Sequence, residues 1–102
     1  MPTRRAVIMN RVDNVATAVE EIQAGDEITA VLGGETVSLS AAEMIPYGFK
    51  VSLAEIGPGE TVKKYGEAIG RATMPIAKGT MVHIHNLEGI RGRGDLVEGG
   101  RR

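Results

Sequence analysis

The sequence contains no cysteine and no tryptophan, and it has only one phenylalanine and two tyrosines among 102 residues. Without cysteine the chain forms no disulfide, offers no thiolate to a metal and has no cysteine nucleophile, which fits a reducing compartment. With so few aromatic rings it also offers few surfaces on which single-stranded nucleic acid could stack. The core must therefore be built from aliphatic side chains.

An excess of one charge and long apolar runs are absent as well. The chain carries 12 Lys and Arg against 13 Asp and Glu, for a net charge of -1. A protein that binds nucleic acid or a membrane surface through its charge needs a basic excess. The apolar runs are too short for a membrane-spanning helix or for the hydrophobic region of a signal peptide. We therefore expect a cytoplasmic chain that has neither nucleic acid nor a membrane as its partner.

Length and glycine content describe the organisation of the chain. A length of 102 residues predicts one domain. The 14 glycines are about twice the average usage and are dispersed, which predicts many tight turns. From Arg91 onward the sequence is rich in glycine and arginine and has no periodicity, so we expect a domain over residues 1–90 and a flexible tail over 91–102. The Arg-Gly-Asp tripeptide at 93–95 is interpreted as part of this linker rather than as an adhesion motif.

Local patterns predict a mainly β fold with one helix. Val15, Ala18, Val19 and Ile22 follow helical spacing, which predicts a helix from about Asn14 to Ala24 that ends at a glycine. Alternating polar and apolar residues predict short strands elsewhere. These strands are expected at 5–10, 27–32, 35–39, 49–53 and 80–85, with Gly33-Gly34 as the turn of a hairpin between the second and third.

One short pattern recurs along the chain. An aliphatic residue, two residues, a glycine, two residues and a second aliphatic residue occur at Ile22–Ile28, Ile56–Val62 and Ile76–Val82. The glycine supplies a turn, and the two aliphatic residues pack on either side of it. Because the spacing between copies is irregular, the pattern does not indicate a solenoid. It predicts one kind of turn that is reused in a compact β fold.

Both histidines of the chain lie together at His83 and His85. On a strand they would point to one face, about 6.6–7 Å apart, while Val82 and Ile84 would point to the core. Two imidazoles on one face could share a divalent metal, or one could act as a general base. The alternative is a pair of solvent-facing polar residues on an amphipathic strand.

A metal site at the histidines needs further ligands. Asn86, Glu88 and Glu67 are candidates, although nothing in their spacing requires it. A second candidate group follows Lys63-Lys64, where Gly66 and Gly70 bracket a short segment. Tyr65 and Glu67 would then line a cleft that a ligand or another backbone approaches closely. The alternative is a tight turn or bulge between strands, with the two lysines solvated.

Two blocks of the sequence carry a family resemblance. They are Tyr-Gly-Glu-Ala-Ile-Gly at 65–70 and Val-His-Ile-His-Asn at 82–86, accompanied by Ile-Gly-Pro-Gly-Glu at 56–60 and Ile-Ala-Lys-Gly at 76–79. Together they resemble the SAF domain found at the N-terminus of altronate and galactarate dehydratases, and residues 13–18 resemble the opening of that domain. The resemblance implies the SAF, or β-clip, fold, with short twisted strands and one short N-terminal helix.

The resemblance also implies a class of chemistry. The family carries out β-elimination from a 2-hydroxy acid: water leaves in the sugar-acid enzymes, and sulfite leaves in sulfolactate sulfo-lyase. The dehydratases depend on a divalent metal, commonly iron. This chain resembles the separate small subunit of two-subunit members, which implies a large catalytic subunit as its partner and a sugar acid as the substrate. The metal would be held mostly by the complete two-subunit enzyme, which would be inactive without its large subunit.

The site residues follow from the same resemblance. It implies that His83 and His85 ligate the metal or do acid-base work, with Asn86 beside them, and that Tyr65 and Glu67 contact the substrate or the other subunit. Altronate, galactarate and sulfolactate stay open as substrates, and the chain is also compatible with a homo-oligomer. The alternatives are the small subunit of a sulfolactate sulfo-lyase and a SAF binding module without catalytic duty. A stand-alone enzyme is the least favoured.

Overall fold

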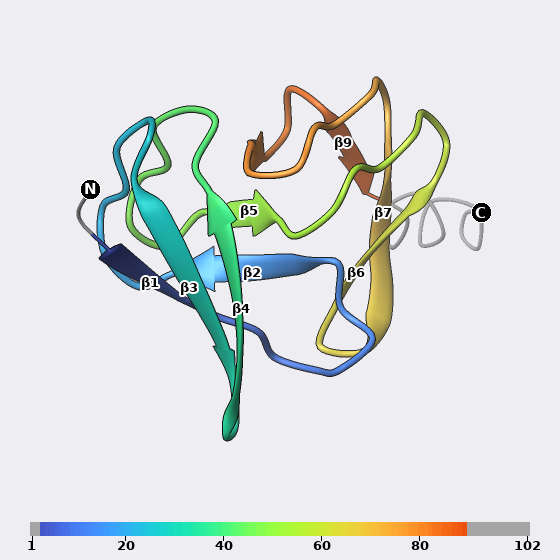
Figure 1. Ribbon diagram of the computed structural model, residues 1–102. Helices are drawn as coiled ribbons and strands as arrows, with labels where there is room; N and C mark the ends of the chain where they lie inside the picture. Colours follow the sequence, from blue (N-terminus) through green and yellow to red (C-terminus); the bar gives the residue numbers. More distant parts are fainter. Residues whose placement is uncertain (1–2, 90–102) are drawn as a thin grey trace.

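The computed structural model describes residues 3–89 as nine short strands in two sheets (Figure 1). The larger sheet has the order β4-β3-β1-β2-β5-β8, and the smaller has the order β6-β7-β9. The strands are β1 (Thr3–Val7), β2 (Val15–Ala18), β3 (Glu27–Leu32), β4 (Glu35–Ser40), β5 (Lys50–Ser52), β6 (Thr61–Lys64), β7 (Glu67–Ala72), β8 (Met81–Val82) and β9 (Leu87–Gly89). The prediction of a mainly β fold is therefore confirmed. The predicted tail at 91–102 lies outside the described residues.

The predicted helix from about Asn14 to Ala24 is wrong. Its first half is strand β2, which pairs antiparallel with β1 on one side and with β5 on the other. Three of the four β2 residues are buried, because the strand is central in its sheet. Long-range pairing therefore overrides the local helical spacing, and β-branched Val15 and Thr17 suit the strand.

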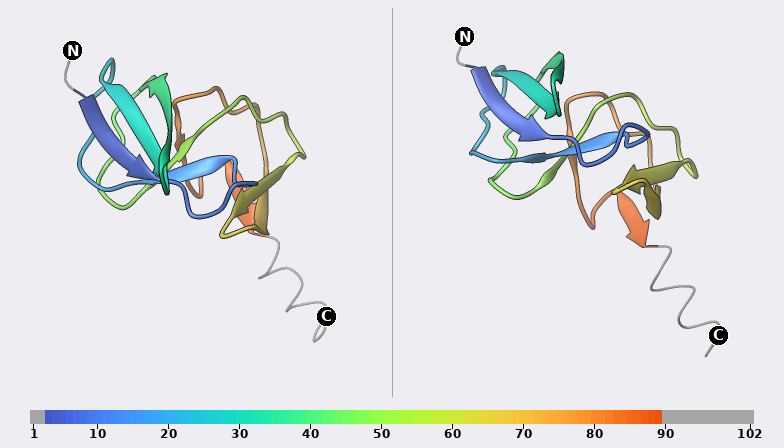
Figure 2. Two further views of the ribbon diagram at one scale, coloured as in Figure 1. Left: turned by 60° about the horizontal axis from the view of Figure 1, so that its bottom comes forward. Right: turned by 90° about the horizontal axis from the view of Figure 1, so that it is seen from below.

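The predicted hairpin is present and extends from the body of the molecule. β3 and β4 pair antiparallel from Glu27 opposite Ser40 to Leu32 opposite Glu35, and the turn residue Gly33 has φ 60°. On its other side β3 pairs with β1 in parallel, so the hairpin continues the larger sheet. Figure 2 shows the two sheets side by side, with β1 at one end and β9 at the other. Over residues 3–89 the fold has no helix with the length and apolarity needed to cross a membrane.

The turn pattern seen in the sequence occurs four times in the structure, once more than predicted. In each copy a glycine with φ between 83° and 89° is the third residue of a turn closed by a backbone hydrogen bond. That φ is typical of a type II turn, and glycine adopts it without steric cost. The aliphatic residues at both ends of every copy are at most 3% exposed. The four copies are Ile22–Ile28, Ile45–Val51, Ile56–Val62 and Ile76–Val82.

The four turns are joined in two reciprocal pairs. Ile22 and Ile45 exchange backbone hydrogen bonds of 2.9 and 2.8 Å, and Ile56 and Ile76 exchange two of 2.9 Å. The glycine of each turn also donates its N–H to a carbonyl four residues before the first isoleucine of the partner turn. The residues at these four positions are small and at most 4% exposed, and they are Ala18, Ala41, Ser52 and Ala72.

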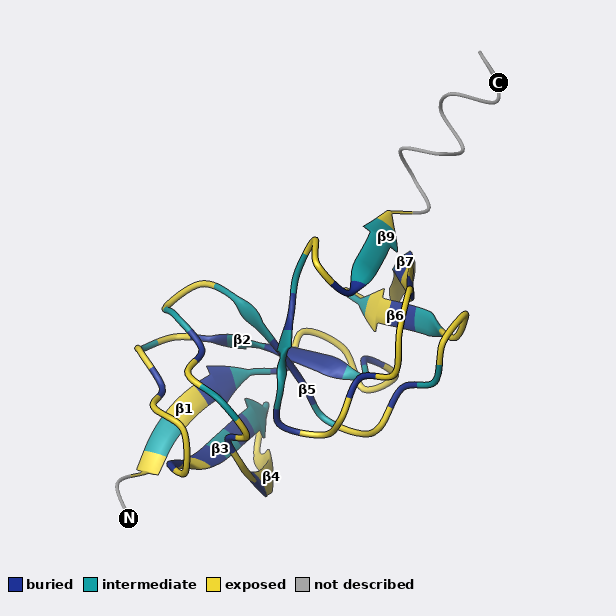
Figure 3. Ribbon diagram, turned by 90° about the horizontal axis from the view of Figure 1, so that it is seen from above, coloured by how far each residue is buried: buried dark blue, intermediate teal, exposed yellow. Residues whose placement is uncertain are grey.

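Each pair of turns has its own apolar cluster. The first is centred on the turns at 22–28 and 45–51, and the second on those at 56–62 and 76–82. β2 separates the two clusters, because Ala16 packs in the first and Val15 in the second. Buried segments accordingly run through the strands at the middle of the molecule, whereas the loops are mostly exposed (Figure 3). The core is aliphatic, as the composition requires.

Candidate functional site

The segment that contains both histidines is a turn. β8 ends at Val82, and the backbone N–H of Asn86 donates to the carbonyl of His83 at 3.0 Å. The Asn86 side chain closes the turn from within: its Oδ1 accepts the His83 N–H at 2.9 Å, and its Nδ2 donates to the carbonyl of Met81 at 2.9 Å. Asn86 is 5% exposed, so its amide is buried and engaged in these bonds. This residue fixes the shape of the segment that presents the histidines.

The turn sends the two imidazoles into different surroundings. The His83 ring is half-buried and lies against the Phe49 ring, with their centroids 4.7 Å apart and their planes at 54°. His85 is exposed, and Ile84 between them is 82% exposed. The predicted strand over 80–85 is therefore wrong beyond Val82, and so is the expected burial of Ile84. The reason is that Asn86 satisfies the backbone locally, which ends the ladder between β5 and β8.

The described residues do not fit a complete metal centre. Within 3–89 no three histidine, aspartate or glutamate side chains come together in a way that could hold an ion. The two imidazoles would need ligands from elsewhere, because divalent transition metals in proteins commonly take three or more side-chain ligands. The divalent metal stays a prediction about the complete enzyme.

Tyr65 lies at the tip of the hairpin between β6 and β7. Its φ is 61° and that of Gly66 is 75°, which is the backbone of a two-residue type I′ turn. Buried Asp13 holds this turn, because its carboxylate accepts the N–H of Tyr65 at 3.0 Å and the N–H of Gly66 at 2.8 Å. Tyr65 is 61% exposed, and the ammonium of Lys64 lies 5.1 Å from the centroid of its ring. The tyrosine is thus held at a strained backbone position and turned to solvent.

The two predicted groups of site residues lie apart. Exposed Glu67 begins β7, next to the Tyr65 turn. At the far end of the same strand, Ala72 pairs with Leu87, which follows the histidine turn directly. The two ends of β7 are five steps apart along an extended strand, or about 16 Å. The structure brings His83, His85 and Asn86 together in one turn and leaves Tyr65 and Glu67 on a separate surface.

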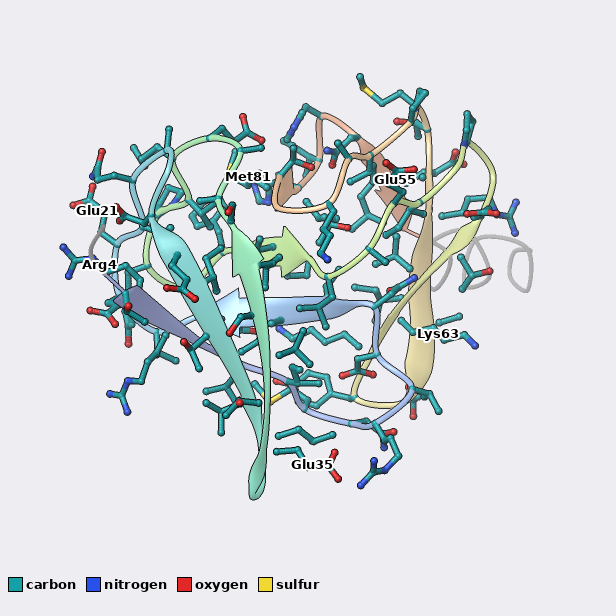
Figure 4. The ribbon with its side chains drawn as sticks, viewed as in Figure 1. Arg4, Glu21, Glu35, Glu55, Lys63 and Met81 are labelled. Atoms are coloured by element: carbon teal, nitrogen blue, oxygen red, sulfur yellow. The ribbon has the colours of Figure 1, made fainter. Side chains whose placement is uncertain are left out.

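Some residues around these groups were missed by the sequence patterns. Asp13 accepts a third backbone hydrogen bond, from Asn10 at 3.0 Å, and thereby ties the loop after β1 to the β6–β7 hairpin. Glu43 accepts the N–H of Met81 at 2.9 Å, just before the histidine turn. Neither residue shows a periodicity that would reveal it, although Asp13 opens the stretch that resembles the family. Figure 4 shows Met81, which precedes the histidine turn, and Glu55 on the same upper side of the molecule.

Two further features of the described residues are an open surface hollow and a half-buried lysine. The paired turns at Glu55–Gly57 and Pro75–Ala77 line an open hollow of ≈ 340 Å³. On β5, burial and, to a smaller extent, the charge of Lys64 lower the pKa of Lys50 below its usual value of 10.5. The hollow is lined by two of the recurring turns, and neither the hollow nor Lys50 includes a predicted site residue.

Comparisons with known proteins agree on one family. Residues 4–89 match the family model of the altronate/galactarate dehydratase SAF domain. The chain is 33% identical over 80 residues to an altronate dehydratase of Bacillus subtilis and 37% identical over 78 residues to that of Escherichia coli. These matches cover 78% and 76% of this chain but 15% of each dehydratase. The chain is also 33% identical over 72 residues to the (2R)-sulfolactate sulfo-lyase subunit alpha of Chromohalobacter salexigens, covering 69% of this chain and 77% of that subunit.

Proposed function

Because the chain belongs to the altronate/galactarate dehydratase SAF domain family, we propose that it is the small subunit of a two-subunit lyase acting on a sugar acid. The observation that supports this proposal is the share of each relative's length that the chain covers. The chain spans 15% of the altronate dehydratases, yet it spans 77% of a relative that is itself named a subunit. The match thus covers one part of the larger enzymes and most of a protein that is itself a subunit, which supports the assignment as a small subunit.

The proposed reaction is elimination of water to give a 2-keto-3-deoxy acid. It requires a base that removes the proton next to the carboxylate, and groups that stabilise the charge that develops. Imidazole is the side chain best suited to moving protons near neutral pH. His85 is exposed at the tip of its turn and can reach a substrate held by another polypeptide. His83 packs on Phe49, so it is better placed to stabilise the turn and to act at the edge of the proposed active site.

The remaining predicted residues have roles at the proposed interface with the large subunit. We assign Tyr65 and Glu67 to contact with the large subunit, because an exposed tyrosine on a rigid turn is a typical interface residue. The divalent metal, iron by the resemblance, would be held mainly by the large subunit. We assign the two imidazoles as this chain's contribution, since no three ligands come together among residues 3–89.

A second candidate is the small subunit of a sulfolactate sulfo-lyase. It is supported by the extent of the match to a protein named as the alpha subunit of such an enzyme. The first step would be the same removal of a proton next to a carboxylate, and the leaving group would be sulfite rather than water. The two candidates therefore differ in substrate and product and not in the part assigned to this chain.

Co-expression with a candidate large subunit, which we expect to be encoded nearby, tests both candidates. The purified pair would be assayed with altronate, galactarate and sulfolactate in the presence of ferrous iron. Formation of a 2-keto acid without sulfite supports the dehydratase, and release of sulfite supports the sulfo-lyase. Turnover by the pair and by neither chain alone is the expected result. Failure of the chains to associate, or no turnover of any of these acids, would contradict the proposal and favour a SAF binding module.

A further inference from the structure

The edge strands of the two sheets are protected unequally. Natural edge strands avoid pairing with other chains by being short, by carrying lysine or proline, or by being bulged. β8 has two residues and β9 three, while β6 has a bulge between Val62 and Lys63 and carries two lysines. β4 has six residues, Glu35–Ser40, with no bulge, no proline and no lysine. Among the described edges it is the one without any of these protections.

The backbone N–H and C=O groups of alternate β4 residues point away from β3, toward solvent. Just beyond the strand, Ala41 donates to the carbonyl of Asp26 and accepts from Gly25, both at 2.9 Å, so its polar groups face β3. In an antiparallel ladder alternate residues face the neighbouring strand. The odd-numbered residues of β4 therefore bond to β3, and the N–H and C=O groups of the even-numbered ones point outward.

The outward groups available for pairing are those of Thr36 and Ser38. The carbonyl of Ser40 is covered, because a Cβ built on Gly79 would lie 2.2 Å from that oxygen. The side chains of Thr36, Val37 and Ser38 are all exposed. Figure 3 shows β4 at the rim of the molecule, away from β6, β7 and β9, so the approach to it is open. A further strand can add here without any rearrangement of the described fold.

We propose that two copies of this chain pair through β4, antiparallel, with Val37 on the twofold axis. Thr36 of each copy then lies opposite Ser38 of the other, and the two pairs exchange four backbone hydrogen bonds. A shift by two residues would require the covered carbonyl of Ser40 or would run past the end of the strand at Gly34. The free backbone groups thus select one register.

The charges and side chains of β4 suit pairing with itself. Glu35 is the single charged residue of the strand, and in this register it lies opposite Leu39 of the other copy, not opposite its own equivalent. It is already paired with Arg11, at 3.1 Å. Val37 is 43% exposed in the single chain and would be covered by its equivalent across the axis. The dimer is independent of the proposed lyase activity, so either can fail without the other.

Engineered cysteines test the register directly, because the chain has none of its own. In Val37→Cys the two Cα atoms would be about 4.5 Å apart, within disulfide range. We expect rapid conversion to a covalent dimer under mild oxidation. The control is Ile84→Cys, whose site is even more exposed, at 82%, and lies in the turn after β8. Equal or faster crosslinking of the control would overturn the proposal.

Sedimentation equilibrium tests the pairing without crosslinks. We expect the wild-type chain to have twice its mass of 10.8 kDa at micromolar concentrations. Ser38→Pro removes an outward N–H from each copy but no bond to β3, and should weaken the dimer about 30-fold, because two of the four bonds are lost. Ser38→Ala should leave it unchanged. Val37→Lys, which places like charges on the axis, gives the same test if the proline variant does not fold. A monomeric wild type, or a dimer unaffected by both variants, would overturn the proposal.

Discussion

Two glycines with the same backbone conformation provide a test of how the turns pack. Gly59 and Gly79 have φ values of 83° and 87° in equivalent turns. A Cβ built on Gly59 meets nothing within 4 Å, whereas one on Gly79 lies 2.2 Å from the carbonyl oxygen of Ser40. Replacement by alanine therefore costs both sites the same backbone strain, about 1–2 kcal/mol. At Gly79 it also forces a backbone atom to move, which adds about 1–3 kcal/mol.

Urea denaturation measures this difference. With m values of about 1–3 kcal/mol per molar, the urea midpoint of Gly79→Ala should be about 1 M lower than that of Gly59→Ala. Because the backbone strain is common to both variants, the difference isolates the close approach of the turn at Gly79 to the end of β4. Equal midpoints for the two variants would refute the packing of these segments. An unfolded Gly79→Ala beside a folded Gly59→Ala would agree with it.

Three further predictions concern single side chains. Asp13→Ala should lower the free energy of unfolding by about 3 kcal/mol in urea titrations, because three backbone N–H groups lose a charged acceptor; a loss below about 1 kcal/mol would contradict this. Lys50→Met should raise the urea midpoint at pH 7. It should also remove the increase in stability expected as pH rises toward 10.5, because the lowered pKa of Lys50 means that the unfolded chain binds more protons than the folded chain in that range. The exposed Lys63→Met is the control, and the same response from both variants would argue against this effect of Lys50. His85→Gln should reduce kcat of the assembled lyase about 10²–10⁴-fold without changing the urea midpoint; activity within twofold of the wild type would remove His85 from the mechanism.

The turns could be predicted from the sequence because their chemistry is local. Three copies were found from an aliphatic residue, a glycine and a second aliphatic residue at fixed spacing, and all three form the expected turn. The fourth, Ile45–Val51, has the same spacing but was not predicted. The reciprocal pairing of the turns could not be predicted, because it joins segments about 20 residues apart through backbone groups.

The predictions of the helix and of the histidine strand are wrong for two different physical reasons. The spacing of Val15, Ala18 and Ile22 fits one helix face, but these residues are buried by strand pairing and by a turn instead. At the histidines, alternation predicted a strand, whereas the buried side chain of Asn86 satisfies the backbone and closes a turn. Periodicity alone therefore does not decide the structure: long-range strand pairing overrides it in the first case and a local side-chain hydrogen bond in the second.

The part assigned to this chain is tested most directly by titrating the purified large subunit with it. Formation of 2-keto acid from the sugar acid that the pair turns over would be followed at increasing ratios of the two chains. We predict no activity from either chain alone, a rise as this chain is added, and saturation at a fixed stoichiometry. A large subunit that is fully active alone, or one that stays inactive at every ratio, would contradict the account.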